Sequence, residues 1–188
     1  MIGSGRWIGL AVVALLALAL MVWPYDPTGL AIEAFKARDY RRAVKLFSQV
    51  IARKPGNAWA LAMRSRSYSA LRKLDRGLAN ANAALKANPK EPMAHFALGS
   101  YYSESKKHEL AIEAYGKAIQ WDPNFADSYH NRSRNFSRLK RFALALQDIN
   151  KALKMEAGSA VHYTGRGYVF DAMGELKKAL RGAMPKSW

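Results

Sequence analysis

Four polar residues between positions 127 and 138 carry the side chains best suited to binding a ligand. Asp127, Asn131, Arg134 and Arg138 follow one another at intervals of four, three and four residues, which places them on one face of a helix. Two guanidinium groups at this spacing repel each other unless an acidic group lies between them. The spacing therefore predicts a site for an acidic partner group, with a solvated helix face neutralised locally by Asp127 as the alternative.

Residues that could support catalysis or bind a metal are scattered along the chain. There is no cysteine, and the four histidines neither share a register nor form a ligand pair at helical spacing. Gly165 and Gly167 lack the third glycine and the preceding strand of a phosphate-binding loop. We therefore expect no enzyme, no metal site and no cofactor. The histidines are His95, His108, His130 and His162.

A period of 34 residues organises the elements that must position these side chains. A helix-breaking proline recurs at Pro55, Pro89 and Pro123, and apolar residues between the prolines follow the period of an amphipathic helix. Self-similarity of this length is typical of stacked helix–turn–helix units. A small residue recurs in the same register at Ala43, Gly77, Ala111, Ala145 and Ala179.

The pattern resembles the tetratricopeptide repeat, which places a small residue at position 8 and an aromatic one at position 11 of each repeat. Gly99, Tyr102, Tyr115 and Pro123 make residues 92–125 the best match. The resemblance implies an all-α superhelix of about five helix–turn–helix repeats with helices of 12–14 residues. Independently of the resemblance, the apolar run before the repeats predicts one N-terminal hydrophobic transmembrane helix. The expected units are residues 1–23 as tail and anchor, repeats 24–57, 58–91, 92–125 and 126–159, and a partial repeat 160–188.

In this family the first helix of each repeat lines a concave groove that binds a protein or peptide. The resemblance therefore implies a groove in which apolar side chains at Trp59, Met63 and Phe96 anchor a partner and Arg134 and Arg138 pair with its acidic groups. Family members that clamp a chaperone's C-terminal carboxylate carry a set of Lys, Asn and Arg side chains that this chain does not reproduce. The expected groove residues are Trp59, Met63, Arg66, Met93, Phe96, Asp127, His130, Asn131, Arg134, Arg138 and Tyr168.

Residues 7–23 contain no charge and are long enough, as a helix, to approach the thickness of a bilayer core. This segment predicts a single-pass membrane anchor, with a cleaved signal peptide as the alternative because Ala17 and Ala19 form a small-x-small site. Arg6 next to the apolar run is typical of an exported protein, although the basic residues of 36–42 favour a cytoplasmic repeat domain. We expect the repeats outside the cytoplasm.

The chain is strongly basic, with 30 Lys and Arg against 14 Asp and Glu and a net charge of +16. All of these charges except that of Arg6 follow Pro24. Two function classes remain on this basis. One is a membrane-anchored, non-catalytic scaffold with a protein partner, acidic in character; the other is an electrostatic binder of anionic lipid or nucleic acid. The apolar groove residues favour the scaffold over nucleic acid binding, and the oligomeric state is left open.

Overall fold

The computed structural model describes residues 26–174, and all regular structure in this range is helical. The helices are separated by short turns, and most are 13 or 14 residues long, as the repeat pattern predicts. The helices are α2 (Thr28–Lys36), α3 (Tyr40–Arg53), α4 (Ala58–Ala70), α5 (Leu74–Ala87), α6 (Pro92–Glu104), α7 (His108–Trp121), α8 (Ala126–Arg138), α9 (Phe142–Met155) and α10 (Ala160–Ala172).

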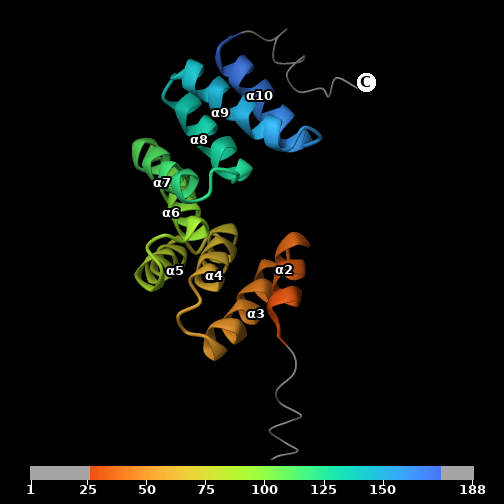
Figure 1. The fold of residues 1–188 in the computed structure, drawn as a ribbon, viewed down its shortest axis with the longest axis vertical. Coiled ribbons are helices and arrows are strands. Elements are labelled where there is room, and N and C mark those ends of the chain that lie inside the picture. Colours follow the sequence, from red (N-terminus) through yellow and green to blue (C-terminus); the bar gives the residue numbers. More distant parts are fainter. Residues whose placement is uncertain (1–25, 175–188) are drawn as a thin grey trace, which may run out of the picture.

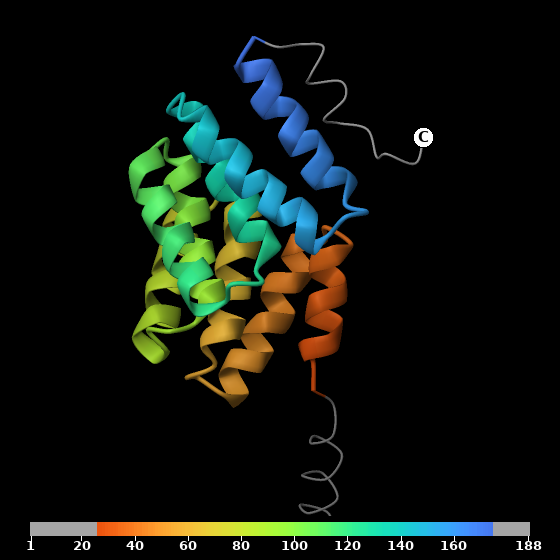
Figure 2. The same cartoon turned by 45° about the horizontal axis from the view of Figure 1, so that its top comes forward.

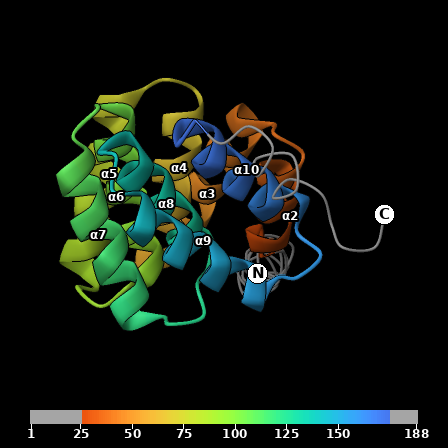
Figure 3. The same ribbon diagram turned by 90° about the horizontal axis from the view of Figure 1, so that it is seen from above.

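The helices form antiparallel pairs that stack into a curved solenoid (Figures 1 and 2). From α4 onward, the first helix of each pair contacts the first helix of the next, so that α4, α6, α8 and α10 form a continuous inner layer. Seen from above, α5 and α7 lie on the outer side, and α4 and α8 lie nearer the centre (Figure 3). The predicted all-α superhelix is confirmed for the described residues.

The linkers between pairs fall where the prolines predict them. Pro55, Pro89 and Pro123 each lie within the four residues that separate a second helix from the next first helix. The first helix departs from the prediction, because α2 has 9 residues rather than 12–14. It begins only after Pro27, which lacks an N–H and occupies the N-cap position.

Small residues inside the pairs allow the helix backbones to approach closely. A Cβ added at Gly99, on the first helix of its pair, would lie 2.8 Å from the Tyr115 ring. On the second helices, Ala43, Ala111 and Ala145 share one repeat position and are fully buried. Aromatic and aliphatic side chains such as Phe47 and Tyr115 fill the remaining volume. The small residues therefore lie where the helices approach closely and the bulky ones fill the core, as the sequence predicts.

Two predicted segments lie outside the described residues. These are the anchor at residues 7–23, with its preceding tail, and the second helix of the last repeat, expected near residues 175–183. Within residues 26–174, none of the helices combines the length and apolarity that crossing a membrane requires.

Candidate functional site

An enclosed arginine fills the inner face at the N-terminal end of the solenoid. The guanidinium carbon of Arg66, on α4, lies 4.8 Å from the ring centroid of Phe35 on α2 and 4.7 Å from that of Phe96 on α6. Its Nη1 also lies 3.4 Å from the sulfur of Met93. Burial lowers the pKa of Arg66. The arginine thus acts as a bridge between three successive first helices, stabilised by two aromatic faces.

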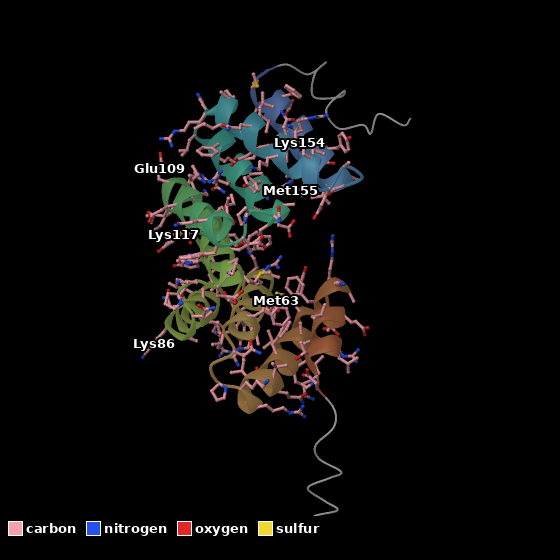
Figure 4. All side chains as sticks on the ribbon, viewed as in Figure 1. Met63, Lys86, Glu109, Lys117, Lys154 and Met155 are labelled. Carbon is pink, nitrogen blue, oxygen red and sulfur yellow. The ribbon has the colours of Figure 1, made fainter. Side chains whose placement is uncertain are left out.

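Two of the expected apolar anchors are part of the core, so their interpretation as partner-binding surfaces is corrected. Met63 is 5% exposed and Phe96 is 4% exposed. Phe96 packs edge-on against Tyr115 and is stacked on Phe125, with ring centroids 5.4 and 5.0 Å apart. Met63 lies towards the centre of the molecule, in contrast to Lys117 and Lys86 on its outer side (Figure 4). Neither anchor offers a partner its apolar surface.

Trp59 and Met93, also expected in the groove, are half-buried. The Trp59 ring packs edge-on against Phe47 with centroids 5.8 Å apart, and Met93 contacts Arg66. Both belong to the packing around α4 and α6. The inner face is therefore occupied by the protein's own side chains from α2 to the beginning of α6.

The four polar residues on one face of α8, Asp127, Asn131, Arg134 and Arg138, differ from these apolar residues because their basic side chains reach the surface. Asp127, Arg134 and Arg138 are exposed, and Asn131 is half-buried with its amide donating to the Asp127 carbonyl oxygen at 2.8 Å. Within residues 26–174, no carboxylate lies within ion-pairing distance of Arg134 or Arg138, and Asp127 forms no salt bridge with either. The local neutralisation by Asp127 that the sequence allowed is therefore absent as a direct contact.

A polar cavity of about 360 Å³ separates α6 from α8. The Tyr115 hydroxyl donates to Ser100 Oγ at 3.2 Å on its wall, and burial raises the pKa of this tyrosine to about 12. The phenol therefore remains protonated. His108 Nδ1 and the Asn135 side chain, 2.9 Å apart, form another part of the wall. The lining residues are Arg72, Ser100, Ser103, Glu104, His108, Tyr115, Asn131, Arg134, Asn135 and Arg138.

A second, more apolar cavity of about 430 Å³ lies between α8 and α10. Val161, which is 64% exposed, and Tyr168 give it apolar surface. The guanidinium of Arg138 lies 5.5 Å from the Tyr168 ring centroid and so lies between the two cavities. The cavity between α8 and α10 is lined by His130, Arg134, Ala160, Val161, Thr164, Gly165 and Tyr168.

Arg134 lines both cavities, which makes it the central residue of the site. On one side are hydroxyl and amide groups such as Ser103 and Asn131, and on the other side is the apolar surface of Val161 and Tyr168. Such an arrangement can bind a carboxylate through charge-assisted hydrogen bonds and an adjacent apolar side chain through burial. Asn131, Arg134, Arg138 and Tyr168 thus line these two cavities together. The other expected groove residues Trp59, Met63, Arg66, Met93 and Phe96 line neither of them.

His130 contributes an edge to the apolar cavity, but most of it is buried in a pair that the sequence did not predict. Its Nδ1 lies 3.1 Å from Nδ1 of His162, which is 1% exposed and whose Nε2 lies 3.0 Å from the Glu156 carboxylate. Burial, and then the charges of His162 and Arg134, lower the pKa of His130 to about 4 against the opposing effect of Asp127. The pair joins α8 to α10. The sequence does contain one indication of this contact. The two histidines are 32 residues apart, close to the repeat period, which places their rings in facing first helices of consecutive repeats.

An ion pair supports α8 from the opposite side. Arg132 donates two hydrogen bonds to Asp148 on α9, at 2.7 and 2.8 Å, and both side chains are largely buried. This geometry stabilises the position of α8, on which the site depends. Within residues 26–174, no cluster of three acidic or histidine side chains has a geometry that could hold a metal ion.

Comparisons with known proteins agree with this architecture. Two family profiles, both described as tetratricopeptide repeat, match the chain, one at residues 28–64 and 62–128 and the other at residues 126–158. A solved thermophilic repeat protein of the same kind from Thermus thermophilus superposes with a TM-score of 0.77 over 86% of this chain and 90% of its own, at 19% sequence identity. At this identity the similarity concerns the fold.

Curated relatives match over about half of the chain. The Hsp70-Hsp90 organizing protein of Triticum aestivum is 28% identical over 92 residues, which is 49% of this chain and 16% of that protein. Serine/threonine-protein phosphatase 5 of Mus musculus is 29% identical over 98 residues, which is 52% of this chain and 20% of that protein. The chain therefore corresponds to a minor part of each relative's length.

Proposed function

Because the chain belongs to the tetratricopeptide-repeat family, we propose that it is a non-catalytic scaffold that binds a segment of a partner protein on its inner face. The bound segment carries an acidic residue followed closely by an apolar one. The acidic group enters the polar cavity and the apolar side chain enters the cavity between α8 and α10. Binding is confined to the C-terminal half of the inner face, since Arg66, Phe35 and Phe96 fill the other half.

The observation that carries this proposal is the position of Arg134. It lines both cavities and has no acidic partner among the described residues. A carboxylate from a partner would supply that missing charge, and Asn131 and Ser103 offer neutral hydrogen bonds beside it. An apolar neighbour of the carboxylate would bury the exposed surface of Val161.

The names of the relatives suggest chaperones as partners, but the side chains of this groove favour another kind of segment. Where chaperone-clamping repeats carry cations and amides, this chain has Phe96, Ser100, Val161 and Gly165. Phe96 is buried, and Gly165 is packed so closely that an added Cβ would lie 2.6 Å from the His130 ring. We therefore propose an internal acidic–apolar segment as the ligand.

The scaffold is further proposed to be tethered to a membrane through residues 7–23, with the repeats outside the cytoplasm. The apolar composition of this segment and Arg6 at its edge support the proposal. Membrane fractions washed with carbonate should retain the protein. An N-terminus beginning near Leu20 in the mature protein would instead identify a cleaved signal peptide. Protease accessibility of the repeats in intact cells decides the orientation.

A peptide array tests the binding mode. It presents peptides in which Asp or Glu precedes Leu or Phe at varied spacing, together with the same peptides carrying Lys in place of the acid. We expect the acidic–apolar peptides to bind, and Arg134→Gln to weaken them about tenfold at low salt. The matched control is Lys117→Gln, because Lys117 lies on the outer side in an exposed ion pair with Glu113. Equal binding of the Lys-containing peptides, or no effect of Arg134→Gln, would contradict the proposal.

A further inference from the structure

The turns within the helix pairs form an edge with an unusual backbone and charge. At the same position in four repeats, a basic residue adopts a left-handed conformation with φ between 58° and 61°, and the fifth repeat has a glycine there, Gly174. Glycine adopts this conformation without steric cost, whereas a residue with a Cβ does not. The basic residues at this position are Arg38, Arg72, Lys106 and Lys140.

The residue that follows in each turn is the N-cap of the second helix. In the first repeat it is Asp39, whose carboxylate accepts a hydrogen bond from the Arg42 amide at 3.1 Å. In the next three repeats it is Lys73, Lys107 or Arg141, and none of these caps its helix with a side chain. A cation at this position loses the capping bond and opposes the helix dipole. Local helix stability therefore does not account for these three residues.

The seven cations of these turns, which we call the basic edge, are all exposed and largely unneutralised. Arg72 pairs with Glu104 at 3.1 Å and Arg141 with Glu109 at 2.6 Å, and the other five form no salt bridge within residues 26–174. The opposite edge, formed by the linkers between pairs, carries one more acidic residue than basic ones. Those linkers hold Lys54 and Lys90 against Glu91, Asp122 and Glu156. The basic edge consists of Arg38, Arg72, Lys73, Lys106, Lys107, Lys140 and Arg141.

The basic edge is continuous with the polar cavity. Arg72 belongs to both, and Glu104 and His108, which flank the turn at Lys106, also line the cavity. The cavity has side-chain dimensions, and its walls combine three arginines with hydroxyl and amide groups, while its one carboxylate, Glu104, is paired with Arg72. Such walls suit an amino-acid carboxylate better than a duplex or a flat lipid surface. Among the side chains of residues 26–174, the large apolar ones that are exposed lie outside the basic edge; they are Leu110, Trp121, Leu144 and Val161.

We propose that the basic edge binds a run of acidic residues in the same partner segment whose acidic–apolar element occupies the cavities. This inference rests on the proposed function and extends it to the partner's flanking sequence. The segment leaves the polar cavity beside Arg72 and continues along the turns at Lys106, Lys107 and Lys140. The edge supplies steering and salt-dependent affinity, while the cavities supply the specific contacts.

The test uses the full chain, an acidic–apolar peptide in a neutral context, the same peptide extended by a run of glutamates, and the glutamate run alone. We expect the extension to tighten binding about tenfold at low salt. The variant Lys73→Ser/Lys107→Ser/Lys140→Gly should lose that gain and bind the unextended peptide normally. Serine is a good N-cap and glycine suits the left-handed position, so this variant should fold at least as stably as the parent protein.

The outcomes separate this inference from the proposed function. If the unextended peptide fails to bind but glutamate runs still bind through the edge, the groove proposal fails and the edge remains. If the extension gives no gain, or a gain that the triple variant keeps, the edge inference is overturned. It is also overturned if duplex DNA or vesicles containing phosphatidylglycerol bind more tightly than the extended peptide in an edge-dependent way. Binding of the extended peptide that decreases with both salt and the triple substitution supports it.

Discussion

Two arginines at the same repeat position have opposite environments in this solenoid. Arg66 on α4 and Arg134 on α8 are separated by 68 residues, which is two repeats. Arg66 is enclosed between Phe35 and Phe96, and Arg134 is exposed on the wall of two cavities. Because the backbone frame is the same, the difference arises from the neighbouring side chains.

The residues that occupy the flanking positions two repeats later are small and hydroxylated. Ser103 stands in the place of Phe35, and Thr164 stands in the place of Phe96. Ser103 lines the polar cavity and Thr164 lines the apolar one. Arg66 is therefore packed because two aromatic rings flank it, and Arg134 is available to a ligand because hydroxylated side chains stand in their place. The comparison predicts that substitutions in the N-terminal half affect stability and that those in the C-terminal half affect binding.

The largest effect is expected at Phe96. Phe96→Ala removes a ring that packs on Arg66, Tyr115 and Phe125, and should lower the free energy of unfolding by about 3 kcal/mol. The equivalent substitution Thr164→Ala, at an exposed position, should change it by less than about 0.5 kcal/mol. Urea unfolding of both variants measures the difference. Similar stability losses would show that the two halves are packed alike.

Acid should weaken the C-terminal half selectively. The folded pKa of His130 is lowered to about 4, whereas the unfolded chain takes up the proton near its ordinary value of about 6.5. The unfolded state therefore binds more protons below pH 6.5, and stability falls as the pH falls from about 6.5 to about 4. The loss approaches about 3 kcal/mol at the lower limit.

Unfolding curves at several pH values, with hydrogen exchange to locate the opening, measure this loss. The amides of α10 should lose protection before those of α4, because the His130–His162 pair joins α8 to α10. His130→Gln should flatten the pH dependence. An unchanged slope in that variant, or simultaneous loss of protection in both halves, would contradict the assignment to His130.

An aromatic ring placed over Arg134, like the rings that enclose Arg66, should weaken binding and leave the fold intact. Thr164→Phe places a ring where Phe96 lies two repeats earlier, so it should fill the apolar cavity and cover Arg134. We expect the acidic–apolar peptide to bind about thirtyfold more weakly, equivalent to about 2 kcal/mol. Thr164→Val, which removes the hydroxyl without adding a ring, is the control. Tighter binding to Thr164→Phe would mean that the peptide does not use this cavity.

The repeat period predicted the fold because each small residue and each proline acts within one helix pair. Gly99 faces Tyr115 within a pair, and Pro123 lies in the linker that follows. The site was predicted only in part, since its properties depend on contacts between pairs. The two rings that enclose Arg66 are Phe35, at position 12 of the preceding repeat, and Phe96, at position 5 of the next. The periodicity of a single helix does not reveal a contact of this kind.

Contacts between helix pairs also explain why Met63 and the two histidines differ from the sequence prediction. Met63 lies on the first-helix face that also packs against neighbouring repeats, so a position assigned to the groove by resemblance is buried here. His130 and His162 occupy different repeat positions, and their proximity follows from the stacking of α8 on α10. Arg134 and Arg138 share one face of α8, as helical spacing predicts, because that relation depends on a single helix.

The most direct test compares Arg66→Ala and Arg134→Ala for affinity to one acidic–apolar peptide at low salt. We predict that Arg134→Ala weakens binding about tenfold with unfolding stability preserved. Arg66→Ala should bind the peptide with the affinity of the parent protein and unfold more easily, because its side chain joins Phe35 to Phe96. Equal weakening of peptide binding by the two substitutions, or weakening by Arg66→Ala alone, would contradict the account.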